Sequence, residues 1–363
     1  MAVVVAGAAA LAAIGGVAVV RGSVDGSTPA TVGASGAATT ASSVAVAQTA
    51  TPSATALASD AGPASFPVLP GQGATSRFTT VVVSPRGPAV TVTRPGGTWA
   101  RHRIAVMWLS HVAIRLELHP GVHTSYSRVI DPGASPHWTT SPILSGLRLQ
   151  RGLAATFNGG FKVTNGDAHG GYWDSGYGID GRGRVVHDPS GAQVLHRGVM
   201  SLVMHRDGTW AMGLWGTQLR MTSTVRFVRQ ELTPLVDGGK VEPLTRARSC
   251  QAVWGKTVGG VGCAPWRSGV GVTSAGDLVY VSGAALTPYQ LAVLLREAGA
   301  VRAMQLDVNS QWVSAEYYRP GTTTRAAVAH VLNSPYYRAG HYVSGSVAAG
   351  TASNRDFFAA YLR

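Results

Sequence analysis

The chain of 363 residues has little charge and little lysine. Charged residues make up 13% of it while glycine contributes 46 residues, which disfavours a helical bundle and suits a β-rich, turn-rich protein. Only three of the 30 basic residues are lysines, so arginine carries the formal net charge of +13. Because arginine holds phosphate and carboxylate through a two-pronged fork, this charge fits an anionic substrate or an anionic cell surface.

Motifs for nucleic acid and for metal are missing too. The arginines are spread along the chain, and no zinc-finger spacing, RNA-binding aromatic signature or basic helix occurs, so we expect no nucleic-acid partner. His119 and His123 are four residues apart, but Pro120 and Gly121 between them argue against a helical ligand pair, and there is no H-E-x-x-H. We predict no metal site and no cofactor, and leave a requirement for a divalent cation open.

The chain has two cysteines, Cys250 and Cys263, and they lie close together in sequence. An even count next to an export signal favours one disulfide, which would stabilise the fold by roughly 3 kcal/mol. The alternative is a pair of buried free thiols.

The first 75 residues do not read as a folded domain. Residues 2–20 are uncharged and apolar, about 28 Å long if helical, so we interpret 1–21 as a signal peptide or membrane anchor and favour an anchor or an uncleaved signal. Residues 22–75 are rich in Ala, Thr and Ser without apolar periodicity, which predicts a disordered linker. The protein is therefore expected to be exported, extracellular or at the cell surface, with the N-terminal segment as its contact to a membrane.

Residues 76–363 are expected to form one α+β domain with a large, mostly antiparallel sheet and few helices. Apolar strands and four hairpins are predicted, with turns at 181, 207–208, 237–239 and inside 268–283. The clearest helix has Thr287 as N-cap, Pro288 next and Gln290 completing a capping box, and Gly299 closes it. A short strand, 301–308, follows that helix.

Three segments place polar residues at strand ends, where a rigid scaffold can present them. They are Asn158-Gly159-Gly160, Arg267, and Asp307 followed by Asn309 and Ser310. Each also has a plain structural interpretation: a turn, a solvated arginine, and an aspartate that caps a backbone amide.

Together and in this order, the segments resemble the phosphodiester glycosidase family, which includes the uncovering enzyme of lysosomal targeting. The similarity runs from Leu153 to Tyr318, roughly half of the chain. It is carried by "ATFNGGFK", "LTPLVDGGKV", "RSGVGVTSAGDLVYVSG" and "LTPYQLAVLLREAGAVRAMQLD". The resemblance implies hydrolysis of a sugar–phosphate bond in a phosphodiester.

The resemblance and the residue chemistry give each candidate a role. Arg267 would grip the anionic diester, Asn158 and the amides of Gly159 and Gly160 would hold its oxygens, and Asp307 would activate water or stabilise positive charge at the anomeric carbon. Asn309 and Ser310 are further candidates for binding the phosphate, and His169 is either an acid or base or a plain loop residue. Tyr172 and Trp173 either stack on a sugar ring or fill the rim of the core. The candidates for a second carboxylate are Asp167, Asp174 and Asp237.

One departure from the family pattern keeps other functions open. Val308 and Asn309 stand where the family has a glycine run, and Val308 stiffens a loop whose amides would otherwise approach a phosphate. This favours an alternative, a catalytically silent module that binds anionic cell-wall glycopolymers. A third possibility is a structural envelope protein with an incidental cleft.

Overall fold

The computed structural model describes residues 78–119, 152–161, 170–181, 185–247, 250–255, 262–310, 312–318, 328–329 and 356–363. All of them belong to one compact unit, Ala56–Arg363. The expected signal or anchor and the linker lie outside the described residues, and the boundaries 1–21, 22–75 and 76–363 stay predictions. Among the described residues no helix is long and apolar enough to cross a bilayer.

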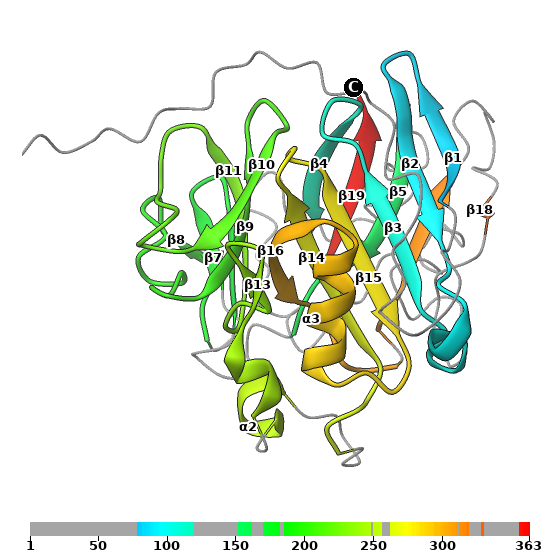
Figure 1. Cartoon of the computed structure of the whole chain (residues 1–363). Coiled ribbons are helices and arrows are strands. Elements are labelled where there is room, and N and C mark those ends of the chain that lie inside the picture. The colour runs from blue at the N-terminus through cyan, green and yellow to red at the C-terminus, as the bar shows by residue number, and fades with distance from the viewer. Residues whose placement is uncertain are drawn as a thin grey trace, which may run out of the picture. The chain divides into compact units, whose positions relative to one another are not determined.

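The described strands form three sheets, and every pairing between them is antiparallel (Figure 1). The eight-stranded sheet runs β1 (Thr79–Ser84), β2 (Gly87–Thr93), β3 (Ala105–Leu109), β15 (Leu278–Gly283), β14 (Arg267–Thr273), β16 (Ala300–Gln305), β12 (Val236–Asp237) and β13 (Lys240–Val241). The six-stranded sheet runs β10 (Trp210–Leu214), β9 (Met200–His205), β11 (Val225–Glu231), β6 (Gly170–Asp174), β7 (Tyr177–Ile179) and β8 (Val185–His187). The five-stranded sheet runs β18 (Val328–Ala329), β17 (Ala315–Tyr318), β5 (Leu153–Asn158), β19 (Phe357–Leu362) and β4 (Ile114–His119).

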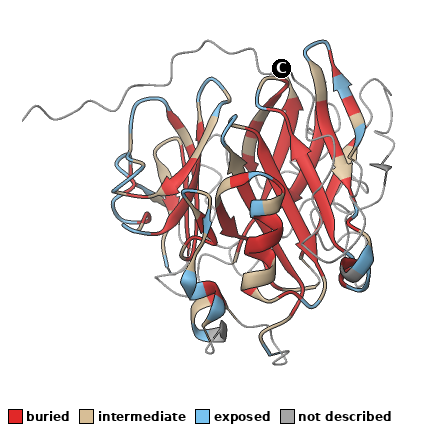
Figure 2. Cartoon of the chain, in the orientation of Figure 1, coloured by how far each residue is buried: buried red, intermediate tan, exposed pale blue. Residues whose placement is uncertain are grey.

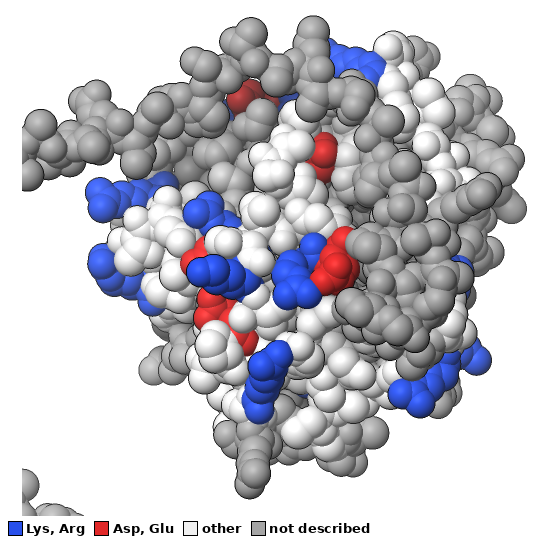
Figure 3. All heavy atoms as spheres, in the orientation of Figure 1, with Lys and Arg blue, Asp and Glu red and all other residues white. Residues whose placement is uncertain are grey.

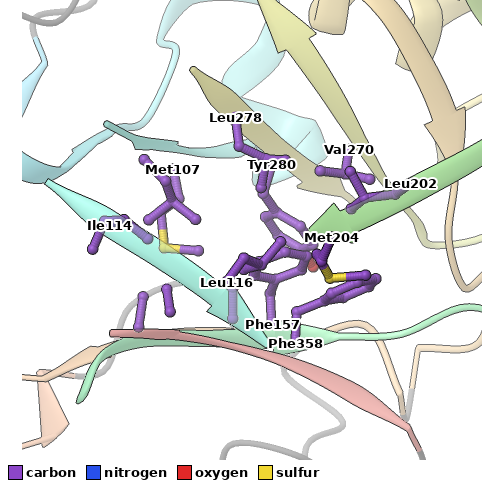
Figure 4. Close-up of a cluster of buried hydrophobic side chains, with 14 of the residues drawn as sticks. Met107, Ile114, Leu116, Phe157, Leu202, Met204, Val270, Leu278, Tyr280 and Phe358 are labelled. Carbon is purple, nitrogen blue, oxygen red and sulfur yellow. The ribbon is translucent and has the colours of Figure 1, made fainter. Parts of the chain in front are cut away.

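The expectation of a mostly antiparallel fold with few helices is confirmed, but the single large sheet is wrong. The strands divide among three sheets because their inner faces meet in one shared core. Met107 and Tyr280 enter it from the eight-stranded sheet, Leu202 from the six-stranded sheet, and Phe157 and Phe358 from the five-stranded sheet (Figure 4). Phe157 stacks on Phe358 with 4.8 Å between ring centroids. Figure 2 shows the strands buried along most of their length, while the turns are exposed.

Helix α3 (Pro288–Glu297) covers the other face of the eight-stranded sheet (Figure 1). It begins as predicted: the Thr287 hydroxyl accepts from the Gln290 amide (3.2 Å) and the Gln290 side chain accepts from the Thr287 amide (2.9 Å). Gly269 and Gly271 of β14 lack side chains where the leucines of α3 and the start of β16 pack, which lets this layer approach closely. The remaining helical segments are short: α2 (Cys250–Trp254), and the 3-10 turns η1 (Gly97–His102) and η3 (Pro243–Arg246).

The predicted disulfide falls partly outside the described residues. The structure describes no free cysteine, but nothing is described of the Cys250 side chain, so its pairing with Cys263 stays a prediction.

Candidate functional site

The end of β5 lies where elements of all three sheets meet. Asn158 is the last residue of β5, its amide donates to the Ser314 carbonyl (2.9 Å), and the next amide, that of Gly159, donates to the Asp356 carbonyl (2.9 Å). Asn158-Gly159-Gly160 is therefore not the turn of a hairpin. It is a strand end between the starts of two neighbouring segments, one before β17 and one before β19.

The Asn158 side chain is buried and joins β5 to the eight-stranded sheet. Its oxygen accepts from the Tyr280 hydroxyl (2.8 Å) and the Ser314 amide (3.1 Å), and its nitrogen donates to the Ser268 hydroxyl (3.0 Å) and the Gly159 carbonyl (2.6 Å). All four hydrogen-bonding positions of the amide are thus used within the protein. In this structure Asn158 positions the site, and its predicted contact with substrate stays a prediction.

Asp307 follows β16 and is tied to the same network through Ser268. The Ser268 hydroxyl accepts from the Asp307 amide (3.2 Å), and the Ser268 amide donates to the Asp307 carbonyl (3.0 Å). The Asp307 carboxylate accepts from the Asn309 amide (2.7 Å), and the side chain is only 3% exposed. Asn158 and Asp307 are therefore neighbours, as the predicted site requires, with Asn309 and Ser310 half-buried beside them.

The two glycines after Asn158 leave room for two carboxylates. A Cβ on Gly159 would stand 1.9 Å from the Asp356 carboxylate, and one on Gly160 would stand 1.7 Å from that of Glu231. Real carbon–oxygen contacts are never this short, so only glycine fits at both positions. Glu231 ends β11 and Asp356 precedes β19, so the carboxylates reach this point from two different sheets.

Arg229 links these two carboxylates. Its Nη1 lies 2.8 Å from Glu231 Oε1 and its Nε lies 2.8 Å from Asp356 Oδ2. The guanidinium also donates to the carbonyls of Gln230 (2.8 Å) and Phe161 (2.5 Å), and its side chain is fully buried. Burial disfavours its charge, but the charges of Asp356 and Glu231 outweigh this and raise the pKa of Arg229.

Glu231 is fully buried and holds its proton more tightly than an ordinary glutamate. Burial raises its pKa well above the usual value, Arg229 opposes this, and the charges of Asp356 and Asp307 add to it. Asp356 is 11% exposed, so solvent reaches the cluster from its side. The site thus contains carboxyl groups in contrasting environments, which is the arrangement that separates an acid from a base.

Arg267 lies on the other face of the eight-stranded sheet from Asn158. Neighbouring residues of a strand point to opposite faces, and Ser268 is the one that faces Asn158. The Arg267 guanidinium donates to the carbonyls of Leu286 (2.9 Å), Trp254 (3.2 Å) and Cys263 (3.3 Å) and to the Gln305 side chain. Burial lowers its pKa to about 10. This geometry gives Arg267 a structural role, and its predicted grip on a diester is not built into the described structure.

Trp173 also serves the core in this structure. It is 3% exposed, packs among Val194, Val203 and Val228, and its indole donates to the Asp188 carbonyl (2.6 Å). Of the two interpretations made from the sequence, the geometry matches the core residue and leaves no open face for a sugar. His169 lies outside the described residues.

The three candidates for a second carboxylate stay predictions. Asp237 pairs with Arg302 (3.2 Å) at a partly exposed position, Asp174 is buried on β6, and Asp167 lies outside the described residues. Sequence reasoning missed Glu231, Asp356 and Arg229. A signal was available, because "RFVRQEL" places three polar residues in a row directly after the apolar pair Phe227-Val228.

No cluster of three or more metal-ligating side chains is found within the described ranges. Two of the described carboxylates at this site, those of Glu231 and Asp356, contact the Arg229 guanidinium. The site comprises Asn158, Gly159, Gly160, Arg229, Glu231, Asp307 and Asp356.

Comparisons with known proteins give distant structural similarities. No protein-family model matches, and no curated protein matches. A hypothetical protein from Synechocystis has a TM-score of 0.39 and 11% identity, over 79% of this chain and 64% of that one, less than two thirds of its length. The catalytic domain of zebrafish N-acetylglucosamine-1-phosphodiester alpha-N-acetylglucosaminidase, auto-inhibited by its pro-peptide, has a TM-score of 0.38 and 13% identity, over 80% of this chain and 89% of that one. A putative exported protein from Burkholderia pseudomallei has a TM-score of 0.22, with 12% identity over 71% and 73% of the two chains. TM-scores this low carry no argument about function, which has to come from the residues.

Proposed function

We propose that the protein is an exported hydrolase that cleaves the sugar–phosphate bond of phosphodiester-linked glycans. The observation that carries the proposal is that Glu231 and Asp356 lie against the glycines that end β5, while Asp307 is joined to Asn158 of the same strand end through Ser268. Cleavage of a glycosidic bond uses one carboxyl group that gives a proton and another that is ionised. The phosphodiester as substrate and the export both come from the sequence: from the four matching segments and from the apolar N-terminal run.

Glu231 is the proton donor in this proposal. As the sugar–oxygen bond breaks, Glu231 gives its proton to a phosphate oxygen of the leaving group, and Asp307 stabilises the positive charge at the anomeric carbon or takes a proton from the attacking water. A protonated Glu231 also does not repel the single negative charge of a diester. In this proposal Asp356 neutralises the charge of Arg229, so binding of the anionic diester does not depend on that arginine.

We expect Asp307→Asn and Glu231→Gln to reduce sugar release, but by different amounts. A lost acid or base costs typically 10²–10⁴-fold in rate. A phosphate monoester leaves readily, so we place Glu231→Gln near about 10²-fold and Asp307→Asn further toward about 10⁴-fold. The measurement is free sugar released from a panel of sugar-1-phosphodiesters, including nucleotide sugars, by the full chain.

Asp277→Asn is the matched control, since it removes a buried carboxylate at the far end of the β14–β15 hairpin, where Asp277 pairs with His111 (2.7 Å). It should leave the rate unchanged. Full activity in the Asp307 and Glu231 variants would refute these roles. Binding of sugar phosphates without release from any member of the panel would instead favour the silent binding module.

A further inference from the structure

Arg229 touches Glu231, yet Glu231 remains the acid in the proposed reaction. A guanidinium at 2.8 Å would ordinarily lower the pKa of a carboxyl group, since it favours the charged form. The structure has to offset this effect for Glu231 to donate a proton. Asp356 can offset the charge of Arg229, because its carboxylate lies 2.8 Å from Nε of the same guanidinium.

Asp356 and Glu231 bind different nitrogens of the same guanidinium. Asp356 takes Nε and Glu231 takes Nη1, each at 2.8 Å, and within the described residues the guanidinium also donates to the backbone carbonyls of Gln230 and Phe161. One positive charge is therefore shared between two carboxyl groups, and Asp307 adds a third close by. Because one guanidinium cannot balance two anions in a buried site, one of the two carboxyl groups bound to it has to stay neutral.

Of the three groups, Glu231 is the one that the structure shields most from water. Its side chain is fully buried, whereas Asp356 is 11% exposed, and the Asp307 carboxylate accepts from the Asn309 amide. Tyr172 and Asp174 on β6 also face this cluster: Tyr172 pairs across the strands with Arg229, and Asp174 with Phe227. Neither of them adds a positive charge.

We propose that Arg229 and Asp356 are positioning residues that keep the proton on Glu231, because Asp356 neutralises the guanidinium that would otherwise ionise it. The assignment of the proton stands on the geometry, and only its catalytic consequence rests on the proposed function. The raised pKa of Glu231, with Asp356 among its causes and Arg229 opposing it, agrees with this assignment.

The proton can be observed without any substrate. At pH 7, infrared spectra of the full chain should contain the carbonyl band of a protonated carboxyl group that Glu231→Gln removes. Asp356→Asn keeps the shape of the side chain but removes its charge, so the titration midpoint of that band should fall by about 1–3 pH units, the usual effect of an opposite charge left unbalanced nearby. Asp277→Asn should leave the midpoint where it is.

Arg229→Gln gives the opposite sign, since removing the cation should leave the midpoint unchanged or higher. If the circular dichroism spectrum shows that Asp356→Asn does not fold, the infrared titrations of Arg229→Gln and of the wild-type protein still test the proposal. A wild-type protein without a protonated Glu231 band at pH 7, an unmoved midpoint in folded Asp356→Asn, or a lower midpoint in Arg229→Gln would each overturn the proposal.

Activity adds a readout that a merely structural role would not move. In Asp356→Asn the alkaline limb of the pH–rate profile should shift to lower pH, whereas a structural defect would lower the rate equally at every pH. A band that shifts as predicted in a protein that cleaves no sugar phosphodiester would refute the proposed function and leave the proton assignment intact.

Discussion

Gly160 fits beside Glu231 only because it has no side chain. A Cβ there would lie 1.7 Å from Glu231 Oε1 and 2.6 Å from its Cγ, and Arg229 holds that side chain in place. We therefore expect Gly160→Ala to cost about 1–3 kcal/mol of unfolding free energy, the usual range for overpacking, and to reduce sugar release. Equilibrium unfolding in urea measures the first effect and the sugar assay the second.

Gly96→Ala is the control for that change. Gly96 has a negative φ of −87°, and nothing lies within 4 Å of the position that its Cβ would occupy. Its unfolding free energy and its rate should match those of the unchanged protein. Equal losses in both alanine variants would mean that the Gly160 effect does not come from Glu231.

The sequence located the strand end at Asn158 but not the reason for its glycines. "NGG" predicted backbone amides that hold the oxygens of a ligand, and the structure places carboxylates in the space beside both glycines. Glu231 and Asp356 reach this place through β-strand pairing with distant segments. Local patterns carry no record of such pairing, so the sequence pointed to Asp307 from its own segment but not to Glu231 or Asp356.

At the scale of elements, helix α3 was predictable because its signals are local. Its capping box, first-turn proline and closing glycine lie within thirteen residues of sequence, 287–299, and each was confirmed. The hairpins at 207–208 and 237–239 were predictable for the same reason, since turn chemistry is read from adjacent residues. Strand β19 pairs instead with β4 and β5, which are far from it in sequence.

We expect Thr287→Ala to destabilise the protein by about 1 kcal/mol, because it removes the N-cap that accepts from the Gln290 amide. Urea unfolding provides the measurement. Thr79→Ala, at an exposed position of β1, is the matched control and should change the free energy by less than about 0.5 kcal/mol. Equal destabilisation by the two substitutions would show that the cap contributes nothing.

At the scale of the whole molecule, neither the three-sheet arrangement nor the distribution of charge follows from composition. The sequence predicts antiparallel strands, but which strands share a sheet depends on contacts such as Phe157 on Phe358. The basic residues on the face in Figure 3 stand in separate groups, several beside acidic residues. The +13 charge is thus not gathered into one block on this face, in line with arginines that are spread along the chain.

Stability should fall in mild acid because the fold half-buries His119 at the end of β4. The ring stacks on Phe357 with 5.0 Å between centroids, and burial lowers its pKa to about 4 although Glu117 lies 3.7 Å away. An unfolded histidine titrates near about 6.5. Below that value the unfolded chain binds a proton that the native protein refuses, so stability falls as the pH drops from about 6.5 to about 4.

This one group should account for about 3 kcal/mol of that loss. His119→Phe keeps an aromatic ring on Phe357 and cannot titrate, so its unfolding free energy should decline less steeply over the same interval. His187→Phe, at an exposed position against Tyr177, is the control for replacing a histidine with a phenylalanine. Urea unfolding between pH 4 and 7 gives the slope of the unfolding free energy against pH for each protein. Comparing these slopes removes the contribution of the carboxylates, which titrate in all three proteins. Parallel curves for His119→Phe and the unchanged protein would show that the His119 ring already carries its proton in the native state.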